Sequence, residues 1–141
     1  MKNISITFLL LTPLLASPAF AAGFNGTWSI DLRSDQEKKN NAECGKASFT
    51  LSQLDNNAIV GSQEFYTVGC GRINESSSIE GEAKGNKAIL VITSGRNNAK
   101  VKGEATLKNG KLHWHVLEEL SNGDPPNDGL ILGDAVLEME E

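Results

Sequence analysis

The segment 101–117 alternates apolar and polar side chains on both sides of an Asn-Gly pair. Asn109 and Gly110 suit a two-residue type I′ turn, because both of its central residues need a positive φ. The pattern therefore predicts a β-hairpin with one apolar and one polar face. The expected cross-strand pairs are Leu107 with Leu112, Ala105 with Trp114 and Gly103 with Val116 on the apolar face, and Thr106 with His113, Glu104 with His115 and Lys102 with Leu117 on the polar face.

A second hairpin is predicted around Gly85 and Asn86, because glycine at the first central position suits a type II′ turn. Its apolar face again sets small residues opposite larger ones. The expected pairs are Ala83 with Ala88, Gly81 with Leu90 and Ile79 with Ile92 on that face, and Lys84 with Lys87, Glu82 with Ile89 and Glu80 with Val91 on the other.

Alternation of this kind recurs along the chain, and about eight strands are expected. No stretch of comparable length has helical periodicity. The polar segment 33–43 is the one place where a short helical turn or a loop is expected, and Pro125 and Pro126 make 121–129 a loop. The predicted strands are 27–33, 47–54, 58–68, 78–84, 87–93, 99–107, 111–118 and 130–139.

Short strands joined in sequence by tight turns form an up-and-down antiparallel meander. A sheet of this kind leaves two edges exposed unless it closes on itself. The predicted fold is therefore all-β, with a single closed barrel of about eight strands. A two-sheet β-sandwich is the alternative.

The N-terminal segment has one positive charge, then an apolar run at 8–15 and then small residues at alternate positions. This order predicts a secretory signal peptide, residues 1–21, cut after Ala21 or alternatively after Ala22. The apolar run is shorter than the roughly 20 residues that span a bilayer, so we expect no membrane insertion. The expected product is a periplasmic or secreted protein in which residues 22–141 form a single β-barrel domain.

The two cysteines, Cys44 and Cys70, are predicted to form a disulfide, because an exported chain meets an oxidising compartment. Closing the loop between them would stabilise the fold by roughly 3 to 4 kcal/mol on the chain-entropy model. The formal net charge is -5, and nucleic-acid binding needs a basic patch instead. Nucleic acid is therefore not a predicted partner.

The assigned interior positions are all apolar, which favours a barrel filled by its own side chains. A small-molecule site normally needs a few polar groups placed to orient the ligand. Gln63 and Tyr66 are candidates for that role, because they lie on the one strand whose facing the pattern does not settle. They are the predicted ligand residues if the barrel binds a small molecule.

His113 and His115 share one face of their strand, a spacing that could offer two imidazoles to zinc or copper. Glu104 lies opposite His115 in the predicted register and could be a third ligand. The other interpretation is that both histidines lie on the surface, because the register that buries Trp114 turns them outward. We favour the surface interpretation and keep the metal site as the alternative.

Catalytic patterns are absent from the sequence. It contains no G-x-S-x-G, H-E-x-x-H or P-loop motif, and both cysteines are expected in the disulfide. Paired carboxylates such as Glu80 with Glu82 are interpreted as solvated surface charges rather than as a glycosidase pair. We expect no catalytic residues and no cofactor, and hence a protein that is not an enzyme.

Gly26, Thr27 and Trp28 open the first strand, and a Gly-x-Trp at this place resembles the calycin-type barrels: lipocalins, avidins and bacterial metalloprotease inhibitors. The resemblance covers the first strand and the eight-strand meander. It implies that Trp28 plugs one end of the barrel. The hairpin register makes Trp114 the second core tryptophan. The metalloprotease inhibitors are also similar in being small and exported, with one disulfide shortly after that tryptophan. They insert a free N-terminal segment into the protease, of which residues 22–25 would be a very short version.

These observations lead to two hypotheses of function. The first is an exported non-enzymatic binding protein, such as a periplasmic inhibitor or an immunity-type protein that acts on a protein partner. The polar loops 33–43 and 121–129 would supply its contact surface, and the acidic charge suits a basic partner. The alternative is a carrier of a small apolar ligand in a calycin-like barrel.

Overall fold

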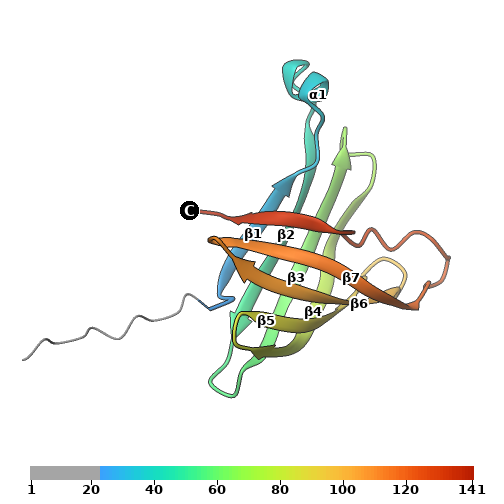
Figure 1. Cartoon of the computed structure of the whole chain (residues 1–141). Coiled ribbons are helices and arrows are strands. Elements are labelled where there is room, and N and C mark those ends of the chain that lie inside the picture. Colours follow the sequence, from blue (N-terminus) through green and yellow to red (C-terminus); the bar gives the residue numbers. More distant parts are fainter. Residues whose placement is uncertain (1–22) are drawn as a thin grey trace, which may run out of the picture.

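The computed structural model describes residues 23–141, so the predicted signal peptide, residues 1–21, lies outside the described residues. This described part holds no helix with the length and apolar character of a membrane span. It contains eight strands and one short helix (Figure 1). Their bounds are β1 (Gly26–Asp31), α1 (Asp35–Lys39), β2 (Cys44–Gln53), β3 (Ala58–Val68), β4 (Ile73–Lys84), β5 (Lys87–Thr93), β6 (Lys100–Lys108), β7 (Lys111–Ser121) and β8 (Ala135–Met139).

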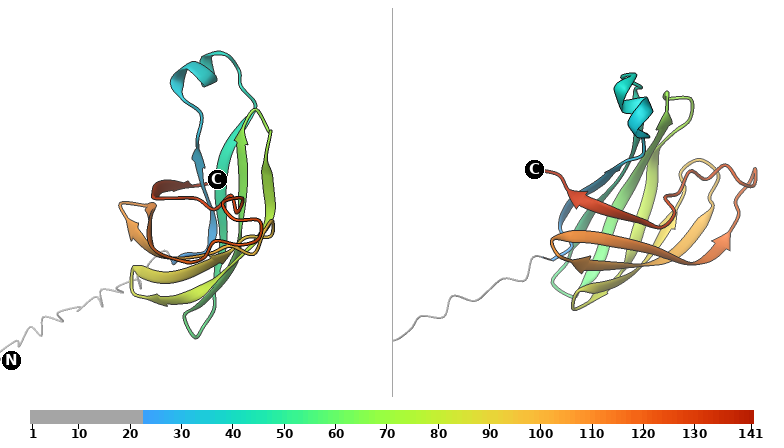
Figure 2. Two further views of the ribbon diagram at one scale, coloured as in Figure 1. Left: turned by 90° about the vertical axis from the view of Figure 1, so that its right-hand side faces the viewer. Right: turned by 45° about the horizontal axis from the view of Figure 1, so that its top comes forward.

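The strands form one closed antiparallel barrel in which every strand pairs with its neighbours along the chain. This confirms the predicted up-and-down barrel, and the alternative of a two-sheet sandwich is wrong. The long strands β2, β3 and β4 stand upright in Figure 1, and the later strands run across them. Figure 2 shows these later strands curving round to complete the ring.

A short seam between β1 and β8 closes the barrel. β1 pairs with β2 along its whole length, but with β8 only at Trp28 and Ser29. Just beyond these pairs, the Glu140 N–H donates a hydrogen bond to the Thr27 carbonyl at 2.8 Å. The other strand pairs of the barrel have longer registers than this seam.

Both predicted tight hairpins are confirmed. Asn109 and Gly110 have φ angles of 53° and 73°, as a type I′ turn requires, and Gly85 begins the other turn with a φ of 62°. The register between β4 and β5 agrees with every predicted pair. The turn residues thus fixed which side chains point inward, because a slip by one residue would turn the whole strand over.

One predicted pair of the hairpin formed by β6 and β7 is wrong. Lys102 lies opposite Glu118 rather than Leu117, while Gly103 still faces Val116. Leu117 is therefore an extra residue on β7, a β-bulge that bends the strand and increases its twist. Leu117 is 49% exposed. An extra residue on the exposed side does not disturb the apolar pattern of the core, so the sequence did not predict the bulge.

Several predicted strand limits also differ from the structure: β1 ends at Asp31 instead of at residue 33, and β7 continues to Ser121 instead of ending at residue 118. β2 begins at Cys44 and β4 at Ile73, so both strands extend further than predicted toward the end where α1 lies. β8 begins only at Ala135, because the preceding backbone is hydrogen-bonded to interior side chains instead of to a strand. The predicted strand 130–139 is correct only in its second half.

The core fills the barrel with the side chains that the alternation placed inward. Trp114 packs edge-on against Phe49, with ring centroids 5.3 Å apart and planes at 85°. Gly103 lies beneath the indole, since a Cβ there would come within 2.3 Å of the Trp114 side chain. The inward positions confirmed as buried are Ile79, Ala83, Ala88, Leu90, Ile92, Ala105, Leu112 and Trp114.

Trp28 is buried as well, with 3% of its surface exposed. Its Nε1 donates a hydrogen bond to the Phe24 carbonyl at 2.9 Å, which satisfies the polar edge of the ring. Phe24 is itself fully buried and belongs to the same core. A plug function for Trp28, as the calycin resemblance implies, stays a prediction.

Candidate functional site

The interior polar side chains are bound to a segment of the chain itself. Residues 122–134, here called the strap, connect β7 to β8. Gln63, which is fully buried, donates from Nε2 to the Leu130 carbonyl at 3.0 Å and accepts the Leu132 N–H at 2.8 Å. Trp114 Nε1 donates to the Leu132 carbonyl at 3.0 Å. Both ends of the amide of Gln63, the predicted ligand residue, are therefore hydrogen-bonded to the strap.

A second buried cluster holds the strap a few residues earlier. Asn74 and Ser94, each 1% exposed, both donate to the Gly129 carbonyl, at 2.9 and 2.6 Å. The Asn74 amide also lies 2.7 Å from the Ser77 hydroxyl. Within residues 23–141, no buried side-chain nitrogen or oxygen lacks a hydrogen-bond partner. The sequence pattern did not predict this cluster. A polar residue at an inward position interrupts the alternation of apolar and polar side chains, and the pattern gives no sign that this residue is buried.

Charged and amide groups fasten the outer side of the strap. Asp128 accepts a hydrogen bond from Arg96 at 2.9 Å and one from Arg72 at 3.2 Å. The Arg96 bond is the main cause of a lowered pKa for the Asp128 carboxyl, with Arg72 adding to it. Asn97 Nδ2 donates to the Pro125 carbonyl at 2.8 Å. The predicted loop 121–129 is thus fixed to the barrel at several points.

Tyr66 does not join Gln63 in a shared site. Its hydroxyl donates to Glu75 at 2.9 Å, with the Glu64 carboxylate 3.4 Å away. The Glu75 hydrogen bond is the main cause that raises the pKa of Tyr66 to about 12. A register shift between Gln63 and Phe65 accompanies this arrangement on β3. Tyr66 therefore belongs to the half-exposed outer side of the strand, whereas Gln63 is inside.

The predicted metal ligands form separate surface pairs. His115 Nδ1 lies 2.8 Å from Asp134, and Glu104 forms an ion pair with Lys87 at 3.6 Å. His113 faces Thr106 across the hairpin, as predicted. Among residues 23–141, no three His, Cys, Asp or Glu side chains come together in a group that could hold a metal. The three candidates consequently do not assemble as a site.

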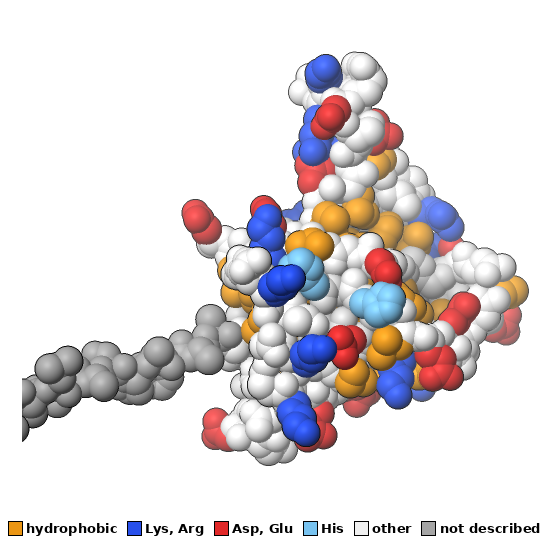
Figure 3. Space-filling view, viewed as in Figure 1, with side chains coloured by type: hydrophobic (Ala, Val, Ile, Leu, Met, Phe, Trp, Pro, Cys, Tyr) orange, Lys and Arg blue, Asp and Glu red, His pale blue; other side chains and the backbone are white. Residues whose placement is uncertain are grey.

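The segment 33–43, here called the braced loop, contains α1 and has a different character from the strap. Figure 1 shows α1 standing clear of the ring of strands, above the ends of β2 and β3. None of the helical residues is buried. In the space-filling view, this projecting tip carries mainly charged and polar side chains (Figure 3). A helix with no buried face gains nothing from core packing, so local interactions must hold it.

Those local interactions begin with a capping box. The Ser34 hydroxyl accepts the Glu37 N–H at 3.2 Å, and the Glu37 carboxylate accepts the Ser34 N–H at 2.7 Å. Two N–H groups at the start of the helix are satisfied in this way. The acidic residues of the first turn and the basic residues of the last turn also complement the helix dipole.

Arg33 braces the base of the loop. Its guanidinium forms a two-pronged pair with Asp31, at 3.0 and 2.8 Å, and also donates to the Ala42 carbonyl at 3.1 Å. The hydrogen bonds from Arg33 hold the pKa of the Asp31 carboxyl well below its usual range. One side chain therefore connects the start of the loop to its end.

The predicted disulfide supplies the last brace. Cys44 and Cys70 are bonded, with Cα atoms 5.3 Å apart, which confirms the prediction. The bond ties the end of the braced loop to the turn between β3 and β4. Beside it, the Gly69 N–H donates to the Glu43 carbonyl at 2.8 Å. The disulfide and this hydrogen bond thus join the loop and the turn into one tip.

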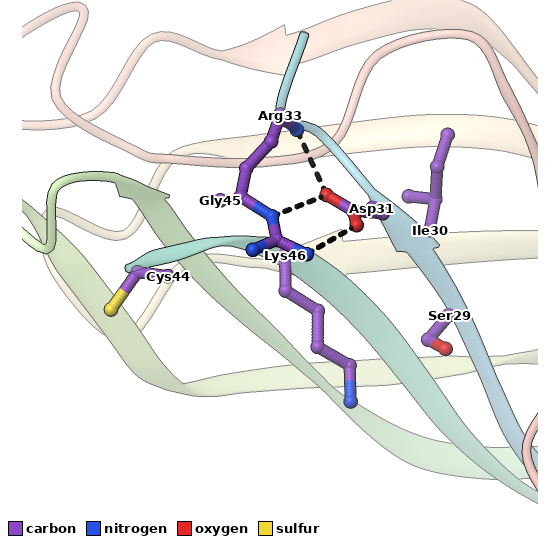
Figure 4. Close-up of a pocket in the computed structure, with 7 residues that line it drawn as sticks. All are labelled: Ser29, Ile30, Asp31, Arg33, Cys44, Gly45 and Lys46. Atoms are coloured by element: carbon purple, nitrogen blue, oxygen red, sulfur yellow. Dashed lines mark hydrogen bonds and ion pairs between the residues drawn. The ribbon is translucent and has the colours of Figure 1, made fainter. Parts of the chain in front are cut away.

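A cavity of about 370 Å³ lies at the base of this tip (Figure 4). Its charged groups are already paired: Asp31 with Arg33 inside it, and Lys46 with Glu140. Paired and exposed ions of this kind make poor acids or bases for catalysis. The lining consists of Ser29, Ile30, Asp31, Arg33, Cys44, Gly45 and Lys46.

No family model, curated protein or solved structure matches this chain. Its structure is that of a small, closed, eight-stranded antiparallel barrel with one disulfide.

Proposed function

We propose that this protein is an exported, non-enzymatic binding module that inserts its braced loop into a concave site of a protein partner, as an inhibitor or an immunity-type protein does. The observation that carries the proposal is a helix with no buried residue that is nevertheless fixed by a capping box, an arginine and a disulfide. Since α1 contributes no core packing, it does not support the barrel. We explain its fixed position by the surface that it offers to a partner.

Preorganisation is the physical advantage of such a loop. Binding costs free energy when flexible loops and side chains must be ordered, and a loop that is already rigid avoids that cost. The projecting shape suits an enzyme cleft, because a convex element can enter a concave site that a flat surface could not fill. The base cavity beside Arg33 gives the rim of the partner a place to dock.

The calycin resemblance gives secondary support, since one of its groups inhibits metalloproteases. Those inhibitors use a free N-terminal segment, whereas the projecting element of this protein is the braced loop, which is held by the disulfide. The disulfide agrees with a periplasmic or secreted location. The carrier alternative lacks comparable support, because Gln63, Asn74 and Ser94 already bind the strap.

Site-specific photo-crosslinking tests the proposal. A photoreactive amino acid is placed at Lys38 on α1 and, as a matched control, at Asp55 in the turn at the opposite end of β2; both residues are exposed. The protein is produced and irradiated in its native compartment. We expect one discrete protein adduct from position 38 and none from position 55. Adducts from position 55 alone, or from neither position, would reject the braced loop as the contact surface.

Purified partner then allows an affinity test. Ser34→Ala removes the capping hydroxyl while leaving the rest of the loop intact, and lost helix caps typically cost about 1 kcal/mol. If rigidity contributes to binding, Kd should rise about fivefold. Ser52→Ala, on the exposed side of β2, is the control and should leave Kd unchanged.

A further inference from the structure

A groove on the outer face of β3, β4 and β5 is independent of the braced loop. It has a volume of about 660 Å³. It lies toward the β4–β5 turn, whereas the braced loop is tied to the β3–β4 turn at the other end of β4. The residues that carry the argument are Ala58, Val60, Glu80, Glu82, Ile89 and Val91.

The strand register gives the groove aliphatic sides and an acidic centre line. Glu80 lies between Val60 on β3 and Val91 on β5. In the next outward-facing row, Glu82 lies between Ala58 and Ile89. Val60 is 46% exposed and Ile89 39% exposed, although both are large aliphatic residues in the middle of a sheet.

Neither carboxylate lies directly opposite a cation in the register, although Lys84 follows Glu82 on the same face of β4 and Lys102 lies one strand beyond Val91 in the row of Glu80. No ion pair joins either Glu80 or Glu82 to another residue within 23–141, although Glu104 on the nearby β6 is paired with Lys87. They lie two residues apart on one face of a strand, a spacing of about 7 Å along the strand. Lys100, at the end of the groove near Thr93, is the one basic residue in its lining.

We propose that this groove binds an extended segment of a cationic protein, with basic side chains at alternate positions placed over Glu80 and Glu82. An extended strand repeats its side chains on one face every two residues, so its spacing matches that of the two glutamates. The aliphatic stems of lysine or arginine would lie against Val60 and Ile89 while their charged ends meet the carboxylates. This assignment does not depend on the function proposed for the braced loop.

The same observations argue against other occupants. A small inorganic cation would use the carboxylates but leave the aliphatic sides exposed to water. A second copy of this chain, with its net charge of -5, would be repelled by the acidic centre line. A basic and partly aliphatic segment satisfies both parts of the surface.

The probe is a fluorescent peptide, Val-Lys-Val-Arg-Val, titrated into the purified full-length protein at low salt and followed by fluorescence anisotropy. We expect saturable one-to-one binding. The double variant Glu80→Gln with Glu82→Gln should raise Kd about tenfold, as the loss of two exposed ion pairs allows. Its matched control is Glu118→Gln with Glu138→Gln, which removes the same charge from β7 and β8 and should change Kd less than twofold.

A second measurement tests the aliphatic part of the proposal. The variant Val60→Ser with Ile89→Ser keeps all charges and should also weaken binding. Equal effects of the control charge variant, or unchanged binding by the Val60→Ser, Ile89→Ser variant, would show unspecific charge attraction and overturn the proposal. Self-association of the protein that is lost in the Val60→Ser, Ile89→Ser variant would assign the groove to a second copy instead.

Discussion

Replacing Gln63 by glutamate tests how the strap is held to the barrel. The two side chains have nearly the same shape, but glutamate at neutral pH has two acceptors and no donor. One carboxylate oxygen could still accept the Leu132 N–H. The other would face the Leu130 carbonyl at the position where the amide now donates over 3.0 Å. The variant therefore either buries an unpaired charge or takes up a proton.

Protonation sets an upper limit to the cost. A protonated glutamate can donate to the Leu130 carbonyl much as the amide does, so the penalty cannot exceed that of protonating the side chain. With an ordinary glutamate pKa of about 4.3 and about 1.4 kcal/mol for each pH unit, the limit at pH 7 is about 3.7 kcal/mol. Burial and the facing carbonyl oxygen both raise the folded-state pKa of the introduced carboxyl above its unfolded value. The free energy of unfolding, relative to the original protein, should accordingly be unchanged below pH 4 and should fall as the pH rises toward the folded-state pKa.

Urea unfolding at pH 4, 5.5 and 7, followed by tryptophan fluorescence, measures this dependence. Trp114 is a suitable reporter because its indole N–H is bonded to the strap at Leu132. Gln63→Leu is the uncharged control: it should lose about 1 to 3 kcal/mol at every pH, since the Leu132 N–H is left without an acceptor. A glutamate variant as stable as the original at pH 7, or one whose deficit does not shrink in acid, would refute the assigned bonding.

Three further predictions concern the tip, the core and the outer side of the strap. Replacing Cys44 and Cys70 by serine, which opens a connection spanning 26 residues, should lower the free energy of unfolding in urea by about 3 to 4 kcal/mol; a loss below about 1 kcal/mol would contradict the entropic account. Gly103→Ala should destabilise the fold by about 1 to 3 kcal/mol, because the added methyl group meets the indole beneath which it lies; calorimetric thermal unfolding checks this, and an unchanged Tm would count against the packing. The pKa of Asp128 is lowered by Arg96, so this pair contributes stability above the ordinary aspartate pKa and loses it as the pH falls. Asp128→Asn should therefore reduce the difference in Tm between pH 7 and pH 3, and an unaltered difference would show that the pair does not support the strap.

The parts of the fold that sequence could predict are those fixed by neighbours along the chain. Asn109-Gly110 and Gly85-Asn86 each determine a turn type, and the turn determines the register of two strands. From there, alternation assigns the inward side chains without any long-range information. The disulfide was predictable for a different reason, because the chain has only two cysteines and they allow only one pairing within it.

The parts that sequence could not predict depend on bonds between distant positions. Gln63 interrupts the apolar pattern of its strand because it binds backbone 67 residues further along. Asn74 does the same over 55 residues, and no local motif announces an acceptor so far away. These bonds also explain why the predicted last strand was too long at Leu130. In the candidate site, the polar loop was visible in the sequence, whereas the contact from Arg33 to the Ala42 carbonyl was not.

The seam between β1 and β8 bears on the order in which the barrel can be completed. Protein chains are synthesised from the N-terminus, so β1 emerges first and can pair with β2 once the twelve intervening residues, 32–43, have followed. Its other edge has to wait for β8, the last strand, and the strap whose carbonyls satisfy Gln63 and Asn74 arrives only just before it. Every earlier hairpin forms between neighbours, while ring closure joins the two most distant strands. Completion of the barrel therefore coincides with the arrival of its final strand, and a chain interrupted before the strap would expose both an open sheet edge and the unpaired amides of Gln63 and Asn74.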